Sequence, residues 1–316
     1  MANNPPRRFA AIDIGTVTCR LLVADVIGDE LCELERRLEI VNLGEGVDKT
    51  GVLRPEATQR VAHAIASYRE VIDSVQLADA PEIPVCALAT SASRDARNAQ
   101  DLIDALRQSR VTLSVIPGDR EAALSFKGAS RAFVGEDIVV LDVGGGSTEV
   151  VFGRGGDTPV FRHSFNIGCR RVTERFLAGD PPTQAELAKA RSWIEESMAP
   201  VIAQARDAGI PCKKVIAVAG TATSMVSIDS EMAEYDPDKV DGTFVPRATL
   251  RRIYEQLASL PLHERMQVVG LEPKRAPVIV AGALILDVVL GLLGAEGFSA
   301  SESDILQGII LDAAGL

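Results

Sequence analysis

Two short segments of the same kind could carry phosphate chemistry. Asp13-Ile14-Gly15-Thr16 and Asp142-Val143-Gly144-Gly145 each place an aspartate near the end of an apolar, strand-like run and a glycine two residues later. A carboxylate at such a place can hold a cation or orient water, and the turn after it can present backbone N–H groups to phosphate oxygens. One such tripeptide alone is more typical of a structural turn. Two of them predict a pair of phosphate-binding turns.

Two loops add to this pattern. Gly144-Gly145-Gly146-Ser147-Thr148 has three successive glycines, which weaken any strand or helix and are better explained by close approach of a ligand to the backbone. Ala219-Gly220-Thr221-Ala222-Thr223-Ser224 joins a strand-like run to a helix-like run, where small and hydroxyl residues suit a second phosphate contact. An ordinary helix N-cap would explain the second loop equally well.

The apolar periodicity indicates the elements that position these loops. The first half predicts strands at Phe9–Ile14, Arg20–Ile27 and Leu31–Leu43, a helix from Pro55, strand Val85–Thr90, helix Ala96–Arg107, strand Val111–Pro117 and helix Arg120–Phe133. The second half predicts strands at Ile138–Val143, Glu149–Gly153 and Val160–Ile167, helices near Arg170–Leu177 and Ala185–Ala205, strand Val215–Ala219, and a mostly helical tail with a last strand at Phe298–Ser301. The second half therefore roughly repeats the first.

Five motifs occur in a specific order along the chain. They are Ala11-Ile12-Asp13-Ile14-Gly15-Thr16, Ala89-Thr90-Ser91-Ala92-Ser93-Arg94-Asp95-Ala96, Gly118-Asp119-Arg120-Glu121-Ala122, Leu141-Asp142-Val143-Gly144-Gly145-Gly146-Ser147-Thr148-Glu149 and Ser303-Asp304-Ile305-Leu306-Gln307-Gly308. In this order they resemble the exopolyphosphatases and guanosine pentaphosphate phosphohydrolases, a family of the actin-like ATPase-fold superfamily. The resemblance covers essentially the whole chain.

The resemblance implies an α/β fold with two actin-like (ribonuclease H-like) domains, whose mixed sheets flank a central cleft. We expect domain I at residues 1–125, domain II at residues 126–303, and a C-terminal helix at residues 304–316 that packs back on domain I. The chain resembles the short, two-domain form of the family. High processivity on very long polyphosphate chains is therefore not expected.

The resemblance also implies roles for single residues. Glu121 matches the general base that activates water for attack on a terminal phosphoryl group, and Arg94 matches a phosphate-binding arginine. Asp142 and Glu149 match residues that hold Mg²⁺, with Mn²⁺ as a possible replacement. The other implied substrate contacts are Asp13, Gly15, Thr16, Thr18, Gly144, Gly145, Gly146, Ser147, Thr148, Gly220 and Thr221. Without the resemblance, Glu121 would be interpreted as a solvated carboxylate in a first helical turn, and Arg94 as a surface charge or a member of an ion pair.

Two positions depart from the family pattern. Val17 stands where the family usually has an asparagine, so a side-chain amide contact to phosphate or water is lost while the backbone N–H groups remain. Arg120 stands in place of the first of two paired glutamates, which puts a cation beside the inferred base. That cation could lower the pKa of Glu121 or add a phosphate contact.

We expect a metal-dependent exopolyphosphatase that removes the terminal phosphate of inorganic polyphosphate. The alternatives are hydrolysis of guanosine pentaphosphate with the same residues, an ATP-dependent kinase of the same superfamily, and a polyphosphate or nucleotide sensor without catalysis. The family resemblance also implies a homodimer and a link to the stringent response. A cytoplasmic location fits five cysteines that are scattered singly, and an N-terminus that is unlike a signal peptide.

Composition supports a globular protein and limits its partners. The 316 residues are 47% hydrophobic and carry 33 Lys+Arg against 44 Asp+Glu, a formal charge of −11. Nucleic acid is not expected as a partner, because no basic run with interleaved aromatic residues occurs. A polyanionic substrate therefore needs local cations, for which the candidates are Arg94, Arg97, Lys127, Arg131, Arg170, Arg171, Lys274 and Arg275.

One apolar stretch requires a choice between membrane and core. Val278–Ala295 is long enough to span a bilayer, but Asp287 lies at its middle, where a carboxylate is costly in lipid. We therefore predict a buried core helix, and no membrane partner.

Overall fold

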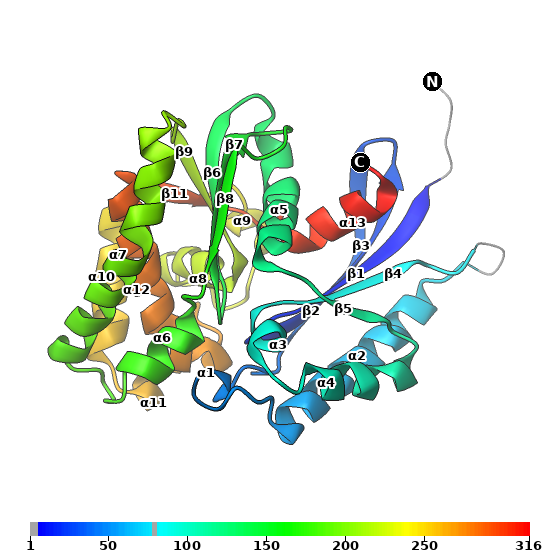
Figure 1. Ribbon diagram of the computed structural model, residues 1–316, viewed down its shortest axis with the longest axis horizontal. Helices are drawn as coiled ribbons and strands as arrows, with labels where there is room; N and C mark the ends of the chain where they lie inside the picture. The colour runs from blue at the N-terminus through cyan, green and yellow to red at the C-terminus, as the bar shows by residue number, and fades with distance from the viewer. Residues whose placement is uncertain (1–5, 78–80) are drawn as a thin grey trace. The chain divides into compact units, whose positions relative to one another are not determined.

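The computed structural model describes residues 6–77 and 81–316, which form two compact units (Figure 1). Unit 1 comprises Met1–Gly128 and Ile305–Leu316, and unit 2 comprises Ala129–Asp304. The change of unit falls near the end of helix α5 (Gly118–Ala129), a few residues after the expected boundary. Each unit is built on one mixed β-sheet, so the predicted α/β class with two mixed sheets is confirmed.

Unit 1 begins with the three antiparallel strands that the sequence predicts. Its elements are β1 (Arg7–Ile14), β2 (Thr18–Ile27), β3 (Glu30–Ile40), α1 (Val47–Thr50), α2 (Pro55–Ser74), β4 (Val85–Ala89), α3 (Ser91–Asp95), α4 (Ala99–Leu106), β5 (Leu113–Val115), α5 and, after unit 2, α13 (Ile305–Ala314). The strand order is β3-β2-β1-β4-β5, with β1, β4 and β5 parallel. Ile14 pairs with Ala89, so β1 and β4 end at the same edge of the sheet.

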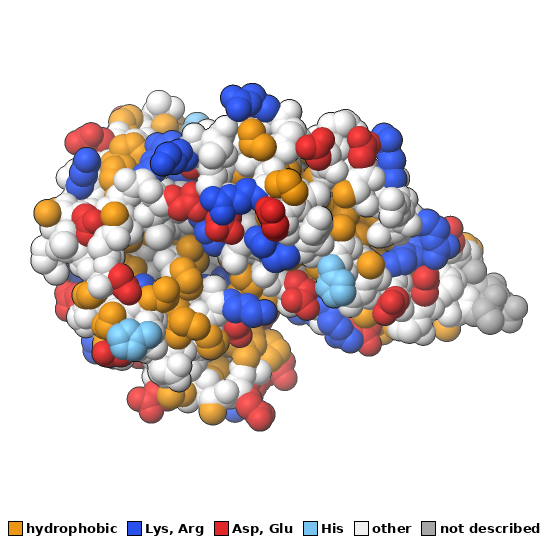
Figure 2. Space-filling model, turned by 90° about the horizontal axis from the view of Figure 1, so that it is seen from below, with side chains coloured by type: hydrophobic (Ala, Val, Ile, Leu, Met, Phe, Trp, Pro, Cys, Tyr) orange, Lys and Arg blue, Asp and Glu red, His pale blue; other side chains and the backbone are white. Residues whose placement is uncertain are grey.

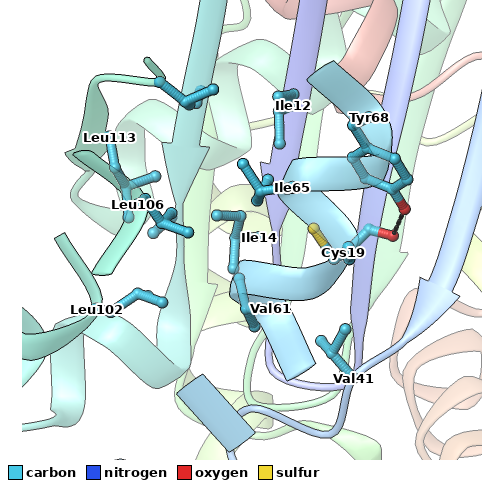
Figure 3. Close-up of a cluster of buried hydrophobic side chains, with 14 of the residues drawn as sticks. Ile12, Ile14, Cys19, Val41, Val61, Ile65, Tyr68, Leu102, Leu106 and Leu113 are labelled. Atoms are coloured by element: carbon cyan, nitrogen blue, oxygen red, sulfur yellow. Dashed lines mark hydrogen bonds between the residues drawn. The ribbon is translucent and has the colours of Figure 1, made fainter. Parts of the chain in front are cut away.

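The alternation along β1 separates two cores in unit 1. Ile12 and Ile14 pack with helices α2 and α4 on one face, as Figure 3 shows. Ala11 belongs to the other core, with residues of α5 and α13. Because side chains alternate along a strand, Asp13 lies on the α5 and α13 face, and so does Arg20, which is paired with it on β2.

The glycine of the last sequence motif allows α13 to approach α5 closely. A Cβ atom at Gly308 would lie 1.9 Å from the main-chain oxygen of Leu124, a distance that no side chain can occupy. Leu124 lies on α5, close to one turn beyond Glu121. Gly308 thus lets α13 support the helix that carries the inferred base.

Unit 2 repeats the strand arrangement of unit 1. Its elements are β6 (Asp137–Val143), β7 (Thr148–Arg154), β8 (Phe161–Phe165), α6 (Cys169–Phe176), α7 (Gln184–Asp207), β9 (Lys214–Val218), α8 (Ala219–Asp229), α9 (Pro237–Val240), β10 (Phe244–Pro246), α10 (Arg247–Ser259), α11 (Leu262–Arg265), α12 (Ala276–Leu293) and β11 (Gly297–Ala300). The order β8-β7-β6-β9-β11 matches that of unit 1, and β10 is added at the β11 edge.

Several details differ from the sequence prediction. The helix predicted at Ala96–Arg107 begins only at Ala99, because residues 96–98 are held in another conformation. There the Asn98 side chain bonds the main chain of Leu53, and the Arg97 N–H bonds Gly51. The short strand β10 was not predicted, since three residues with a proline carry no clear strand pattern.

Helix α12 is a core helix, as predicted. The segment Pro273–Leu293 is long and apolar enough to cross a membrane, but 78% of its most apolar window is buried inside the structure. It packs against α6, α7, α8 and α10. Those contacts supply the apolar surroundings that its composition requires.

Replacing Tyr68 by Phe tests the contact between α2 and β2. The Tyr68 hydroxyl donates to the Cys19 carbonyl at 2.7 Å (Figure 3), and its loss should cost about 1–2 kcal/mol of unfolding free energy, seen as a lower urea midpoint. Burial raises the pKa of Tyr68. The hydroxyl's contribution to the free energy of unfolding is therefore complete below a pH of about 10 and is lost as the pH rises further. The wild type should therefore lose stability more steeply at alkaline pH than the variant. Equal midpoints at neutral pH would contradict this.

Replacing Gly308 by Ala tests the close approach of α13 and α5. Glycine to alanine inside a helix usually stabilises by up to about 1 kcal/mol. Here the added Cβ meets a backbone oxygen, so we expect a loss of about 1–3 kcal/mol instead. Urea or thermal unfolding measures whether the variant is less or more stable than the wild type. A more stable variant would show that the two helices are not in contact.

Candidate active site

In unit 1, two loops lie side by side at the carboxyl ends of β1 and β4. The Thr90 N–H donates to the Ile14 carbonyl at 3.1 Å, and the Gly15 N–H donates to the Thr18 carbonyl at 2.9 Å to close the first turn. The hydroxyls of Thr16, Ser91 and Ser93 are buried here without a hydrogen-bond partner among the described residues. Buried hydroxyls without partners are costly, and phosphate oxygens would be suitable acceptors for them.

A glycine outside the predicted set shapes the first loop. The Gly44 N–H donates to the Thr16 carbonyl at 2.8 Å, and a Cβ at Gly44 would lie 2.3 Å from the Thr16 methyl. Val17, the position that departs from the family, is only 5% exposed, and its carbonyl accepts the N–H groups of Val41 and Asn42. Position 17 thus helps to fix the backbone of the loop.

Asp13 forms an ion pair with Arg20 across the first hairpin. Arg20 donates from Nε and Nη2 to Asp13 Oδ2, at 3.1 and 2.7 Å. The two residues are paired across β1 and β2, and both side chains are largely buried, at 7% and 13% exposed. The carboxylate predicted to contact substrate is therefore held by a cation of its own unit.

Arg94 and Glu121 form a second ion pair in unit 1. Arg94 Nη1 donates to Glu121 Oε2 at 2.5 Å and to the Ile116 carbonyl at 3.1 Å. Glu121 lies in the first turn of α5 and is 8% exposed. The guanidinium fixes the direction of the Glu121 carboxylate, the group that would accept a proton as general base. Sequence reasoning proposed both residues but did not pair them with each other.

In unit 2, two carboxylates face each other across neighbouring strands. Asp142 on β6 is paired with Glu149 on β7, and they are 7% and 1% exposed. Ser164 donates to Glu149 Oε1 at 2.6 Å. Like charges directly opposite on a sheet repel, so a bound cation would stabilise this arrangement.

The donor set fits a hard cation. No group of three or more His, Cys, Asp or Glu side chains suited to a metal occurs among the described residues. The candidate is the facing pair of Asp142 and Glu149. Mg²⁺ typically uses one or two carboxylates and completes its shell with water and phosphate oxygens. Asp142 and Glu149 would hold it.

The triple-glycine loop of unit 2 repeats the turn of unit 1. The Gly144 N–H donates to the Ser147 carbonyl at 3.0 Å, and Val143 pairs with Thr148 as the strands resume. Within residues 6–77 and 81–316, no acceptor is found for the N–H groups of Gly145 and Gly146. These two donors are suited to phosphate oxygens.

Helix α6 holds the triple-glycine loop from its carbonyl side. The N–H groups of Cys169 and Arg170 donate to the carbonyls of Gly144 and Gly145, both at 2.9 Å. Arg171 donates from Nε to the Gly146 carbonyl at 2.9 Å. A Cβ at Gly168 would lie 2.4 Å from Gly145, so only glycine permits this contact.

The third predicted loop is more structural than expected. Its residues form the first turns of α8. The Thr221 hydroxyl donates to the Val143 carbonyl at 3.2 Å, which ties α8 to the end of β6, and a Cβ at Gly282 would meet the Thr221 side chain. Ala219 has a positive φ of 64°, a strained conformation of the kind that often marks functional loops. A Cβ at Gly220 would lie 1.9 Å from the guanidinium of Arg275, so Gly220 makes room for this cation.

Several residues of these loops were missed as site residues in the sequence. Ser91 and Ser93 were part of a motif but were given no role, and their signal was two hydroxyls at a strand-to-helix junction. Arg20 could have been found by counting the register of the first hairpin from Asp13. Gly44 and Gly168 had no signal, because their neighbours are distant in sequence.

Several candidate cations are bonded to partners within their own unit. Lys127 is bonded to Asp312 at 3.4 Å, Arg170 to Glu174 at 3.2 Å, and Arg97 to the Thr50 carbonyl. On the face shown in Figure 2, Lys and Arg side chains lie among Asp and Glu side chains. Local pairs, rather than a broad field, therefore supply the positive charge.

Comparison with known proteins agrees with the motifs. Residues 22–315 match the Ppx/GppA phosphatase family. The chain is 36% identical over 326 residues to Exopolyphosphatase 2 of Mycobacterium tuberculosis, covering 98% of this chain and 99% of that protein. The crystal structure of an exopolyphosphatase-like protein has 33% identity and a TM-score of 0.89, with 98% of both chains covered. That of an exopolyphosphatase from Cytophaga hutchinsonii has 26% identity and a TM-score of 0.88, covering 98% and 99%.

The family match and the identity to a full-length relative together fix the class of the protein. The fold agrees with that of solved family members over nearly the whole chain. The chain is a hydrolase of the phosphatase type and belongs to the Ppx/GppA phosphatase family.

Proposed function

We propose that this chain is a metal-dependent exopolyphosphatase that hydrolyses the terminal phosphate of inorganic polyphosphate. The observation that carries the proposal is the buried carboxylate pair of Asp142 and Glu149, next to the backbone donors of Gly145 and Gly146. A cation and oriented N–H groups are what phosphoryl transfer needs to neutralise and position its charge. The likeness to proteins named exopolyphosphatase supports polyphosphate as the substrate.

Glu121 is the proposed general base. In the reaction, a water oxygen attacks the terminal phosphorus, Glu121 accepts a proton from that water, and the bond to the bridging oxygen breaks. The products are orthophosphate and a polyphosphate shorter by one phosphate. Arg94 holds the Glu121 carboxylate in a fixed direction. The free hydroxyls of Thr16, Ser91 and Ser93 are proposed to donate to phosphoryl oxygens.

Asp142 and Glu149 are the proposed ligands of Mg²⁺, or of Mn²⁺ in its place. When bound by these two carboxylates, a divalent cation would supply positive charge to neutralise the substrate's phosphate oxygens. Ser164 orients Glu149 through its hydrogen bond. Asp13, being paired with Arg20, is proposed to position the first loop and its water rather than to bind metal.

Guanosine pentaphosphate is the competing substrate, since the same residues could remove its terminal phosphate. Relative kcat/KM values for long polyphosphate, short polyphosphate and guanosine pentaphosphate, measured in parallel, decide the preference. The homodimer, the cytoplasmic location and the link to the stringent response stay predictions.

Replacing Glu121 by Gln tests the base. We expect phosphate release to fall about 10²- to 10⁴-fold, because the amide cannot accept the proton from water. Asp119→Asn is the matched control, since Asp119 lies on the same helix turn and is exposed. It should retain wild-type activity. Circular dichroism checks the fold of both variants.

Undiminished activity of Glu121→Gln would remove Glu121 as the base. No release from any substrate by the folded wild type in Mg²⁺, together with tight polyphosphate binding, would favour the sensor. Val17→Asn would then be the first change to make, because it restores the family's amide.

Replacing Asp142 by Asn tests the cation site. The wild type should lose activity in chelator and gain thermal stability when Mg²⁺ is added, because the ion binds only the folded state. The variant should need at least about tenfold more Mg²⁺ for half-maximal activity and lose most of the stabilisation. Asp137→Asn, on the same strand but paired with Lys213, should behave as the wild type. Equal Mg²⁺ stabilisation in all three would refute the assignment.

A further inference from the structure

A buried aspartate in α12 gathers three arginines from two other helices. Asp287 is 0% exposed, in the middle of a helix that is otherwise apolar. Arg191 on α7 donates from Nη2 to Oδ2 at 2.7 Å, and Arg247 and Arg251 on α10 both donate from Nε to Oδ1 at 2.8 Å. Burial would raise the pKa of Asp287, but these three bonds hold it below its usual value.

The cluster has more positive charge than the aspartate needs. One carboxylate in the core is neutralised by a single guanidinium, yet three of them share its two oxygens. Two guanidinium groups on one oxygen repel each other, and a second anion would relieve that repulsion. The surplus is notable in a chain whose formal charge is −11.

Few other acidic groups face these arginines. On α7, Glu195 lies 3.8 Å from Arg191 Nη1 and is 48% exposed, a long and weak contact. On α10, Glu255 acts on Tyr254, whose hydroxyl bonds Arg191. Helix α12 carries no acidic residue besides Asp287. Glu195 therefore offsets part of the surplus at Arg191 only.

Donors of the cluster are available on its solvent side. Arg251 uses only Nε within the described residues, so both of its terminal nitrogens have no protein acceptor, and its side chain is 52% exposed. Arg191 and Arg247 are 33% and 26% exposed. Asp287 fixes all three side chains before any ligand arrives, so little entropy is lost on binding.

We propose that Arg191, Arg247 and Arg251 form a phosphoryl-anion site, separate from the catalytic loops. Arginine forks match the paired oxygens of a phosphoryl group, which makes this the class of ligand the cluster fits best. Asp287 lies about 18 Å along the helix axis from Arg275, the cation over the Gly220 loop, at 1.5 Å per residue. The ligand is a free phosphate or a phosphoryl group of a polyphosphate chain.

Binding to the full-length protein in chelator tests the site without turnover. Tripolyphosphate and inorganic phosphate are titrated separately, by calorimetry, into the wild type, Arg251→Ala and Arg252→Ala. Arg252 is the matched control, because it is the next residue of α10, is similarly exposed, and pairs with Asp229 instead. Arg251→Ala should weaken one binding event about tenfold or more, and Arg252→Ala should leave it unchanged.

A second readout locates the anion on the surface. Phenylglyoxal modifies exposed arginines, and peptide mass spectrometry follows Arg251 and Arg252 in the same sample. Tripolyphosphate should slow the modification of Arg251 several-fold and leave that of Arg252 unchanged. Arg251→Lys is the second variant, in case Arg251→Ala folds poorly. It keeps the positive charge but loses the two-nitrogen geometry of the guanidinium, so it should bind tripolyphosphate less tightly than the wild type.

The outcomes separate the two ligand sources and the structural alternative. Weakening for tripolyphosphate alone assigns the site to a polyphosphate chain, and weakening for both ligands assigns it to a single phosphate. The inference is wrong if Arg251→Ala lowers thermal stability but binds both ligands as tightly as Arg252→Ala, and if tripolyphosphate protects Arg251 no more than Arg252. The cluster then only joins three helices. None of these measurements depends on Glu121 or on catalysis.

Discussion

At the centre of each sheet, one strand pairs antiparallel with its hairpin partner on one side and parallel with a distant strand on the other. The parallel pair fixes where the chemistry lies, because its two carboxyl ends must share one edge of the sheet. In unit 1 this brings the loop after Ile14 beside the segment after Ala89, and in unit 2 the loop after Val143 beside the start of α8 after Val218. Within each unit, a ligand at this edge would therefore meet two segments that are distant in sequence.

The first hairpins of the two units share a backbone conformation at the turn but differ in the charges of their paired side chains. Both turns close with the same N–H to carbonyl bond, from Gly15 and from Gly144. Opposite the strand-end aspartate, unit 1 has Arg20 and unit 2 has Glu149. The first pair joins a carboxylate to a guanidinium, whereas the second places two carboxyl groups on opposite strand positions, which suits a cation. The residue opposite the strand-end aspartate is thus a cation in unit 1 and an anion in unit 2. This difference distinguishes a carboxylate that positions a loop from a candidate metal site.

The sequence predicted the parts of the structure that depend on local pattern. Strand alternation, the glycine-rich turn and the order of motifs gave the two mixed sheets and the family. It did not predict contacts that depend on distant residues, such as Gly308 on Leu124 or Gly168 on the triple-glycine loop. The helix start at Ala99 was also missed, because Asn98 is held by Leu53, which lies far back in the chain. Tertiary contacts decide those features.

An acidic protein can still handle phosphate anions if its cations are fixed locally, and the structure does this with carboxylates. Arg20 is held by Asp13, Arg94 by Glu121, and the three arginines of α7 and α10 by Asp287. Each carboxylate lowers the local positive charge, but it also removes the entropy cost of ordering a long side chain when a ligand binds. At Asp287 the cations outnumber the anion, so positive charge remains for a ligand after the side chains are ordered. The ratio of guanidinium to carboxylate, rather than the net charge of the chain, therefore determines where an anion can bind.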